Sequence, residues 1–196
     1  MAIELPEAVH LAQQLDAALK GKEVINVLTP ERTMSLIRQG FVNLHATLLA
    51  HSVVAGAHAR GKWIFVALEP SRYLLFALET GGKLLYHPPG AQPPATYQVR
   101  IDFNDGSCLT VHIVGWGFAK AVLRRELERE TYPGRLGVSP VDESFTPQLL
   151  AGMVQTAGNH VIKQVLMDQR TLAGIGNGYV QDILFRAGLH PKRRAA

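Results

Sequence analysis

The chain has 196 residues, of which 47% are hydrophobic and 18% are charged. These fractions allow a packed core and exclude a disordered or collagen-like chain. The net charge of +4 is compatible with a polyanionic partner but does not establish one. Because Cys108 is the single cysteine, these residues contain neither an internal disulfide nor a Cys-based zinc module.

We expect a cytoplasmic protein without a membrane partner. No stretch approaches the roughly 18–20 uninterrupted apolar residues of a membrane helix. The first residues include Glu4 and Glu7 and have no basic segment ahead of an apolar one, unlike a secretory signal. A single thiol fits a reducing compartment.

The first part of the chain predicts one helix followed by strands. Pro6 suits a helix start and Gly21 a helix end, and the apolar residues between them predict an amphipathic helix over residues 6–20. From residue 24 to about residue 123 the pattern is typical of strands, with candidates at residues 24–28, 52–54, 63–68, 73–78, 83–86, 98–103 and 107–112. The Asn-Asp-Gly sequence at 104–106 predicts a hairpin. Many short strands favour a β-sandwich or barrel.

The second part predicts helices. A segment rich in Pro and Gly, residues 132–140, is typical of a linker, and helices are expected over residues 146–154, 161–168 and 179–187. The fold class is therefore α+β. We expect a helix and β-sandwich domain over residues 1–131, a linker over residues 132–145, and a partial helical domain over residues 146–196.

The sequence predicts no metal site and no cofactor. The eight histidines include no His-x-x-x-His pair and have no cysteine cluster to complete a tetrahedral zinc site. The Gly-x-Gly of Gly174 and Gly176 follows a predicted helix rather than a strand, so it is not a dinucleotide-binding fingerprint.

The glycine-rich segment itself is the most informative part of the chain. It predicts a helix, a glycine turn and a second helix beginning near Tyr179, where backbone N–H groups favour an anion. Asn177 in the turn and Lys163 one helix earlier would both reach one phosphate. The alternative is a plain connection between helices whose glycines only permit a tight turn, and these features alone favour that alternative.

Four segments stand in order along nearly the whole chain: Glu-Leu-Pro-Glu at 4–7, Arg-Gly-Lys at 60–62, Leu-Gly at 136–137 with Pro140, and the glycine–asparagine segment at 172–191. Together they resemble the formamidopyrimidine-DNA glycosylase/endonuclease VIII family of bacterial base-excision repair enzymes. The resemblance implies a β-sandwich followed by a helix–two-turn–helix domain. It also implies double-stranded DNA with damaged bases or abasic sites as the partner, and we expect a monomer.

The resemblance also implies the chemistry. In the family an N-terminal amine attacks the sugar C1′ of an extruded nucleotide, displaces the base and forms a Schiff base, and elimination then nicks the strand. An α-amine, with an ordinary pKa of about 7.7–8.0, suits this better than a lysine at about 10.4. Glu4 matches the glutamate that transfers protons, and Lys62 matches the lysine that contacts phosphate. Lys163 and Asn177 match phosphate-binding positions, and Gly176 and Tyr179 belong to the same DNA-binding turn.

The ends of the chain depart from the family. The family's nucleophilic proline directly precedes the glutamate, and Ile3 stands there in this chain. The amine would then belong to Ala2 after removal of Met1. Beyond the position of Ala196 the family continues with further helices and a zinc finger, so we expect a truncated or trimmed relative.

Two DNA-contacting loops depart as well. Thr80 stands at the position of the family's void-filling methionine. The family's Arg-Phe wedge is replaced by Val-Gly-Trp-Gly-Phe at 114–118. There Trp116 or Phe118 either intercalates into the duplex or packs in the core of a strand, and the second interpretation is favoured.

Three functions remain open on sequence alone. The first is a DNA glycosylase with apurinic/apyrimidinic-site lyase activity, using the amine of Ala2 or, less favoured, of Lys62, with Glu4 as acid and base. The second is a catalytically degenerate protein of the same fold that binds damaged DNA. The third, a protein with no nucleic-acid role, is disfavoured because four ordered segments rarely arise by chance.

Overall fold

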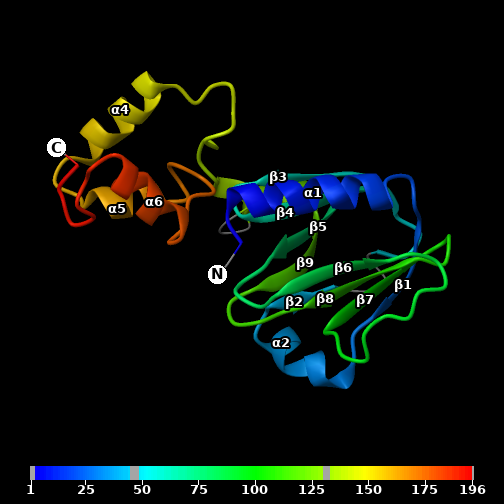
Figure 1. Cartoon of the computed structure of the whole chain (residues 1–196). Helices are drawn as coiled ribbons and strands as arrows, with labels where there is room; N and C mark the ends of the chain where they lie inside the picture. Colours follow the sequence, from blue (N-terminus) through cyan, green and yellow to red (C-terminus); the bar gives the residue numbers. More distant parts are fainter. Residues whose placement is uncertain (1–2, 45–48, 130–132, 196) are drawn as a thin grey trace.

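The computed structural model describes residues 3–44, 49–129 and 133–195, and they form a strand-rich part followed by a helical part (Figure 1). The mixed α+β architecture predicted from the sequence is confirmed. Within the described ranges, no helix is long and apolar enough to cross a bilayer.

The strands form two sheets that face each other. The five-stranded sheet has the order β2 (Val42–Asn43), β9 (Phe118–Leu123), β5 (Arg72–Ala77), β4 (Trp63–Glu69) and β3 (Val53–Arg60). The four-stranded sheet has the order β1 (Val24–Leu28), β7 (Val99–Phe103), β8 (Cys108–His112) and β6 (Lys83–His87). Neighbouring strands are antiparallel except β2 and β9. The predicted sandwich is therefore present.

One apolar core fills the sandwich. Both sheets and helix α1 (Leu5–Leu19) bury side chains in it, among them Ala8, Ala12, Leu15, Ile64, Phe76, Ile101, Phe103 and Leu109. Alternation along the strands directs these residues inward. A second apolar cluster around Trp63, Phe65 and Leu75 covers the outer face of the five-stranded sheet.

Helix α1 begins where the sequence predicted, one residue before Pro6. Glu4 is its N-cap, and a capping box links the Glu4 side chain to the Glu7 N–H and the Glu7 side chain to the Glu4 N–H. The apolar stripe of α1 packs on β3 and β4. The first turn of this helix is therefore fixed by side chains as well as by packing.

The expectation of strands from residue 24 to about residue 123 is wrong at residues 31–38. These form a 3-10 turn, Glu31–Thr33, and helix α2, Met34–Arg38. The hydroxyl of buried Thr33 donates to the Gln98 carbonyl oxygen at 2.8 Å, which ties this turn to the sandwich. A tertiary hydrogen bond thus supports a conformation that apolar patterning did not indicate.

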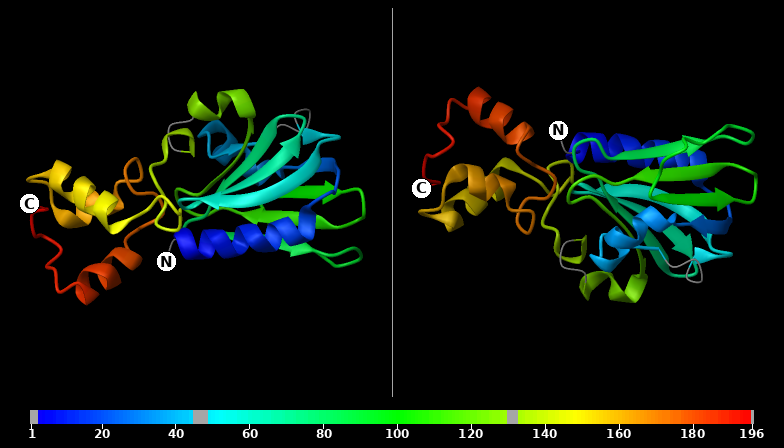
Figure 2. Two further views of the ribbon diagram at one scale, coloured as in Figure 1. Left: turned by 90° about the horizontal axis from the view of Figure 1, so that it is seen from above. Right: turned by 90° about the horizontal axis from the view of Figure 1, so that it is seen from below.

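The helical part contains α4 (Pro147–Ala157), α5 (Ile162–Met167) and α6 (Tyr179–Arg186) around its own small apolar cluster. Two short 3-10 segments, Arg124–Arg129 and Pro133–Arg135, precede it. All views show the start of α1 at the junction between the sandwich and the helical part (Figures 1 and 2). The turn between α5 and α6 reaches this junction, since the Leu5 N–H donates to the Gly174 carbonyl.

Candidate active site

The carboxylate of Glu4 is held at the junction by backbone N–H groups. The side chain is only 2% exposed. Its Oε2 accepts from the N–H of Gly176 at 2.6 Å and from that of Tyr179 at 3.3 Å, and its Oε1 accepts from the N–H of Gly178 at 2.7 Å. Donors at a helix start stabilise a negative charge, so the turn before α6 holds an anion supplied by the protein itself.

The shape of this turn depends on glycine and on Gln169. A Cβ on Gly174, whose φ is 110°, would lie 2.6 Å from the Leu5 Cβ. The Gln169 side-chain oxygen accepts from the Gly174 N–H, and its amide group donates to the carbonyls of Met167 and Ile175. One side chain therefore satisfies three backbone groups of the turn, and a bulkier residue at Gly174 would separate the turn from α1.

Lys62 approaches the same carboxylate from the β3–β4 hairpin. Gly61, with a φ of 59°, occupies the first central position of this two-residue turn, as a type II′ turn requires. The Lys62 Nζ lies 2.5 Å, and the Glu4 Oε1 2.6 Å, from the position that a Cβ on Gly176 would occupy. The ammonium and the carboxylate are therefore neighbours, and the absence of a side chain at Gly176 makes room for both.

The hairpin is anchored to the segment that leads into the helical part. The Arg60 guanidinium donates to the Leu136 carbonyl at 2.8 Å. Across the same contact, the Ala173 N–H donates to the Val138 carbonyl at 2.8 Å. Lys62 is thus held at a defined distance from the glycine turn by bonds on both sides of the junction.

The structure brings together Glu4, Lys62, Gly176 and Tyr179. Asn177 is exposed at the tip of the same turn, while Lys163 lies half-buried on the first turn of α5. No hydrogen bond within the described ranges joins Lys163 to Asn177. The N–H groups of Gly176 and Tyr179, expected to favour an external anion, donate to Glu4 instead. Ala2 lies outside the described residues.

The sequence analysis did not identify two polar side chains of this site, Glu7 and Gln169. Glu7 accepts from the Glu4 N–H at 3.0 Å and from the Tyr179 hydroxyl at 2.8 Å. Burial raises the pKa of the Glu7 carboxyl, but these hydrogen bonds outweigh burial and lower it. The hydrogen bond to Glu7, together with burial, raises the pKa of the Tyr179 phenol. Capping-box spacing from Glu4 was an available signal for Glu7, whereas nothing local indicates Gln169.

The loop between β8 and β9 presents an aromatic side chain near this end of the sandwich. Trp116 is 79% exposed and contacts Phe41 edge to face, with ring centroids 5.8 Å apart. The favoured interpretation of Trp116 as a core residue is therefore wrong. Phe118 is half-buried and packs against the second apolar cluster, with its ring centroid 3.8 Å from that of Trp63. A Cβ on Gly115 would lie 3.9 Å from the Glu79 Cβ, so the Trp116 loop adjoins the turn containing exposed Thr80.

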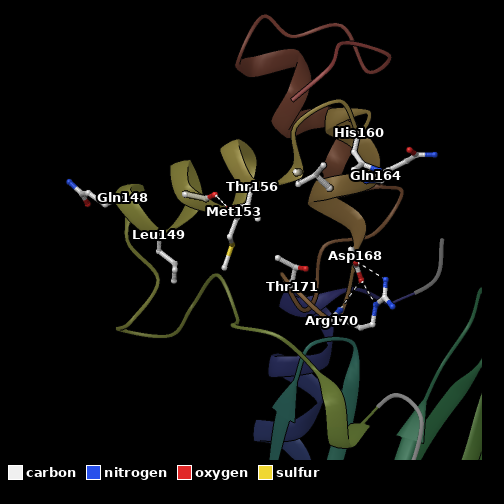
Figure 3. Close-up of a pocket in the computed structure, with 12 residues that line it drawn as sticks. Gln148, Leu149, Met153, Thr156, His160, Gln164, Asp168, Arg170 and Thr171 are labelled. Atoms are coloured by element: carbon white, nitrogen blue, oxygen red, sulfur yellow. Dashed lines mark hydrogen bonds and ion pairs between the residues drawn. The ribbon is translucent and has the colours of Figure 1, made fainter. Parts of the chain in front are cut away.

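A separate groove of about 760 Å³ lies between α4 and α5 (Figure 3). Leu149 and Met153 line it from α4, and an Asp168–Arg170 ion pair of 3.0 Å stands at its edge. Neither Glu4 nor Lys62 lines this groove. In the part of the chain that the structure describes, no three His, Cys, Asp or Glu side chains gather as metal ligands would.

Comparisons with known proteins agree with this arrangement. Residues 2–113 match the family model described as the formamidopyrimidine-DNA glycosylase N-terminal domain, and residues 136–196 match that of the formamidopyrimidine-DNA glycosylase H2TH domain. The formamidopyrimidine-DNA glycosylase of Moorella thermoacetica is 32% identical over 98% of this chain and 70% of its own length. That of Bacillus cereus is 31% identical over 98% and 69%.

Among solved structures, the complex of Lactococcus lactis Fpg with DNA containing an abasic site is similar in fold. Its TM-score is 0.80 at 22% identity, and the match covers 98% of this chain and 69% of that one. The solved structure is similar in fold over nearly the whole of this chain, and the two family models and the relatives above 30% identity agree with it. The chain belongs to the formamidopyrimidine-DNA glycosylase family.

Proposed function

We propose that this protein is a base-excision-repair DNA glycosylase with apurinic/apyrimidinic-site lyase activity that works through an amine Schiff base. The observation that carries the proposal is the buried Glu4 carboxylate, held by three backbone N–H groups beside the Lys62 ammonium. A carboxylate fixed next to a cation suits proton transfer at a sugar whose phosphates the cation attracts.

The proposed reaction has two stages. A free amine attacks C1′, the C1′–base bond breaks, and the departing base receives a proton. The C1′–O4′ bond then breaks, O4′ receives a proton and the nitrogen loses one, which leaves an imine at C1′. This imine makes the C2′ proton acidic, and loss of that proton expels the 3′ phosphate. Glu4 transfers the protons at the sugar, and Lys62 stabilises the phosphate that leaves. The amine and the carboxyl group supply the chemistry, so the proposal needs no cofactor.

The amine is proposed to be that of Ala2 after removal of Met1. Ile3, which directly precedes Glu4, donates its N–H to the Leu78 carbonyl at 3.3 Å, and its side chain packs against the core. A peptide nitrogen is not an amine, so Ile3 cannot serve as the nucleophile. We therefore propose an atypical member of the family, in which a primary amine replaces the proline amine and Lys62 is the less favoured alternative nucleophile.

The proposed partner is double-stranded DNA with a damaged base or an abasic site, bound by a monomer. Asn177 is exposed at the glycine turn, and Lys163 lies on the preceding helix, so we assign both to phosphate contacts. The exposed indole of Trp116 is assigned to stacking in the duplex.

The proposal also divides the chain into a helix and β-sandwich domain over residues 1–131, a linker over residues 132–145 and a partial helical domain over residues 146–196. These residues, with one cysteine, contain no four-cysteine zinc finger.

Borohydride trapping on abasic-site DNA tests the proposal. The wild type should form a covalent adduct, and Glu4→Gln should form it about 100-fold more slowly, because general acid–base groups contribute 10²–10⁴-fold. Glu31→Gln, at an exposed position on the sandwich, is the matched control. Intact mass of the protein and of the trapped peptide would identify the amine. The absence of an adduct in the wild type would contradict the lyase activity.

The same family membership leaves a second candidate function, a degenerate protein that binds damaged DNA without cutting it. The observation that favours it is Ile3 at the position before Glu4. Salt-dependent binding of abasic-site DNA without adduct formation would support this candidate. Trp116→Ala should weaken binding about tenfold, since stacking on a base contributes about 1–3 kcal/mol. Undiminished binding would contradict the stacking role.

A further inference from the structure

We propose that Glu7 and Tyr179 are positioning residues of this site, which together hold Glu4 and the chain leading to it against the glycine turn. This inference rests on the proposed function, because that function assigns proton transfer to Glu4. Neither residue is assigned contact with the reacting atoms. Their role is to set where the Glu4 carboxylate lies.

The evidence is a closed ring of hydrogen bonds. The Glu7 carboxylate accepts from the Tyr179 hydroxyl at 2.8 Å and from the Glu4 N–H at 3.0 Å. Tyr179 in turn donates its backbone N–H to the Glu4 carboxylate at 3.3 Å. Tyr179 therefore contacts both carboxylates, one through its backbone and one through its side chain. The ring joins the start of α1 to the start of α6, two segments about 175 residues apart in the chain.

The charge states suit this ring. The pKa of Glu7 is lowered and that of the Tyr179 phenol is raised, so near neutral pH an ionised carboxylate faces a protonated hydroxyl. The other charged groups around the ring are Glu4 on α1, Asp182 on α6, which also raises the pKa of the phenol, and Lys62 from the β3–β4 hairpin. A hydrogen bond to an ionised acceptor is stronger than a neutral one.

Two substitutions of Glu7 separate geometry from charge. Glu7→Ala removes both acceptors, so the trapping rate should fall about tenfold as the carboxylate is displaced. Glu7→Gln keeps a capping-box acceptor for the Glu4 N–H, so it should retain more of the rate than Glu7→Ala.

Tyr179→Phe tests the other half of the ring. It removes the hydroxyl but leaves both carboxylates, so the trapping rate should fall. Tyr97→Phe, on the sandwich, and Glu31→Gln are matched controls that should leave the trapping rate unchanged. Equal losses of rate in Glu7→Ala and Glu7→Gln would indicate a merely structural role and overturn the proposal.

Amide hydrogen exchange decides the proposal without DNA. Glu7→Ala and Tyr179→Phe should speed the exchange of the Gly178 and Tyr179 amides about tenfold, because these amides donate to Glu4. Unchanged exchange in both variants would overturn the positioning role. If exchange responds while the wild type forms no adduct, the lyase proposal fails and the positioning role stands.

Discussion

The interior of the sandwich and the junction at Glu4 are both buried, but different interactions hold them. The sandwich core is apolar, and its stability comes from burial of side chains such as Phe76 and Ile101. The junction buries a carboxylate, which tolerates burial because backbone N–H groups pair with it. A change in the first region should therefore cost mainly stability, whereas a change in the second should cost mainly the placement of reactive groups.

The largest stability effect is expected in the sandwich. Phe76, on β5, is fully buried, and Phe76→Ala should lower the free energy of unfolding by about 3–5 kcal/mol through lost burial and a residual cavity. Urea denaturation measures this loss. A loss below about 1 kcal/mol would show that the apolar core is not what holds the sandwich.

Gly176→Ala is the sharpest change at the junction. Its Cβ would lie 2.5 Å from the Lys62 Nζ and 2.6 Å from Glu4, so one of these groups must move. We expect trapping about 100-fold slower, since small displacements of reacting groups cost that much. Gly152→Ala on α4 is the control, because no atom lies within 4 Å of its added Cβ. Equal trapping rates in Gly176→Ala and Gly152→Ala would show that the junction does not depend on close placement of Glu4 and Lys62.

Gln169→Leu tests whether the turn is held by side-chain hydrogen bonds. The substitution leaves three backbone groups without this partner, and we expect the free energy of unfolding to fall by about 1–3 kcal/mol. Trapping should also slow, since the same turn carries the Gly176 and Gly178 N–H groups that hold the Glu4 carboxylate. Gln181→Leu, at an exposed site on α6, is the control. A stability change no larger than that of the control would argue against the role of Gln169.

The smallest expected effect is on the pH dependence of stability, through the Lys22–Asp105 ion pair, which lies outside the candidate active site. Hydrogen bonds from Lys22 and then Ser107 lower the pKa of Asp105 to about 2, and the Lys22–Asp105 distance is 2.7 Å. Because the folded pKa lies below the unfolded one, this stabilisation is present above about pH 4 and disappears as the pH falls through about 2. The stability difference between wild type and Asp105→Asn should therefore shrink over that range in denaturation series. A difference independent of pH would contradict the ion pair.

Much of the fold could be predicted because its signals are local. The strand at 24–28 and the start of α6 at Tyr179 fall where expected, since alternation, turn residues and helix periodicity act over a few residues. The helical turn at residues 31–38 could not be predicted, because Gln98 supports it from 65 residues away in the chain. The exposure of Trp116 also escaped prediction, because apolar character alone does not distinguish a core aromatic from one displayed on a loop.

By itself the sequence determined the α+β class, a helix beginning near Pro6 and a glycine turn ahead of Tyr179, because residue types and short spacings carry that information. The choice of Glu4 and Lys62 as site residues came from the family resemblance. Only the tertiary structure decided what the turn binds: its N–H groups hold the Glu4 carboxylate, with Glu7 and Tyr179 beside it. Unpaired N–H groups at a helix start favour any anion. Only folding brings the Glu4 carboxylate, from the other end of the chain, to these N–H groups.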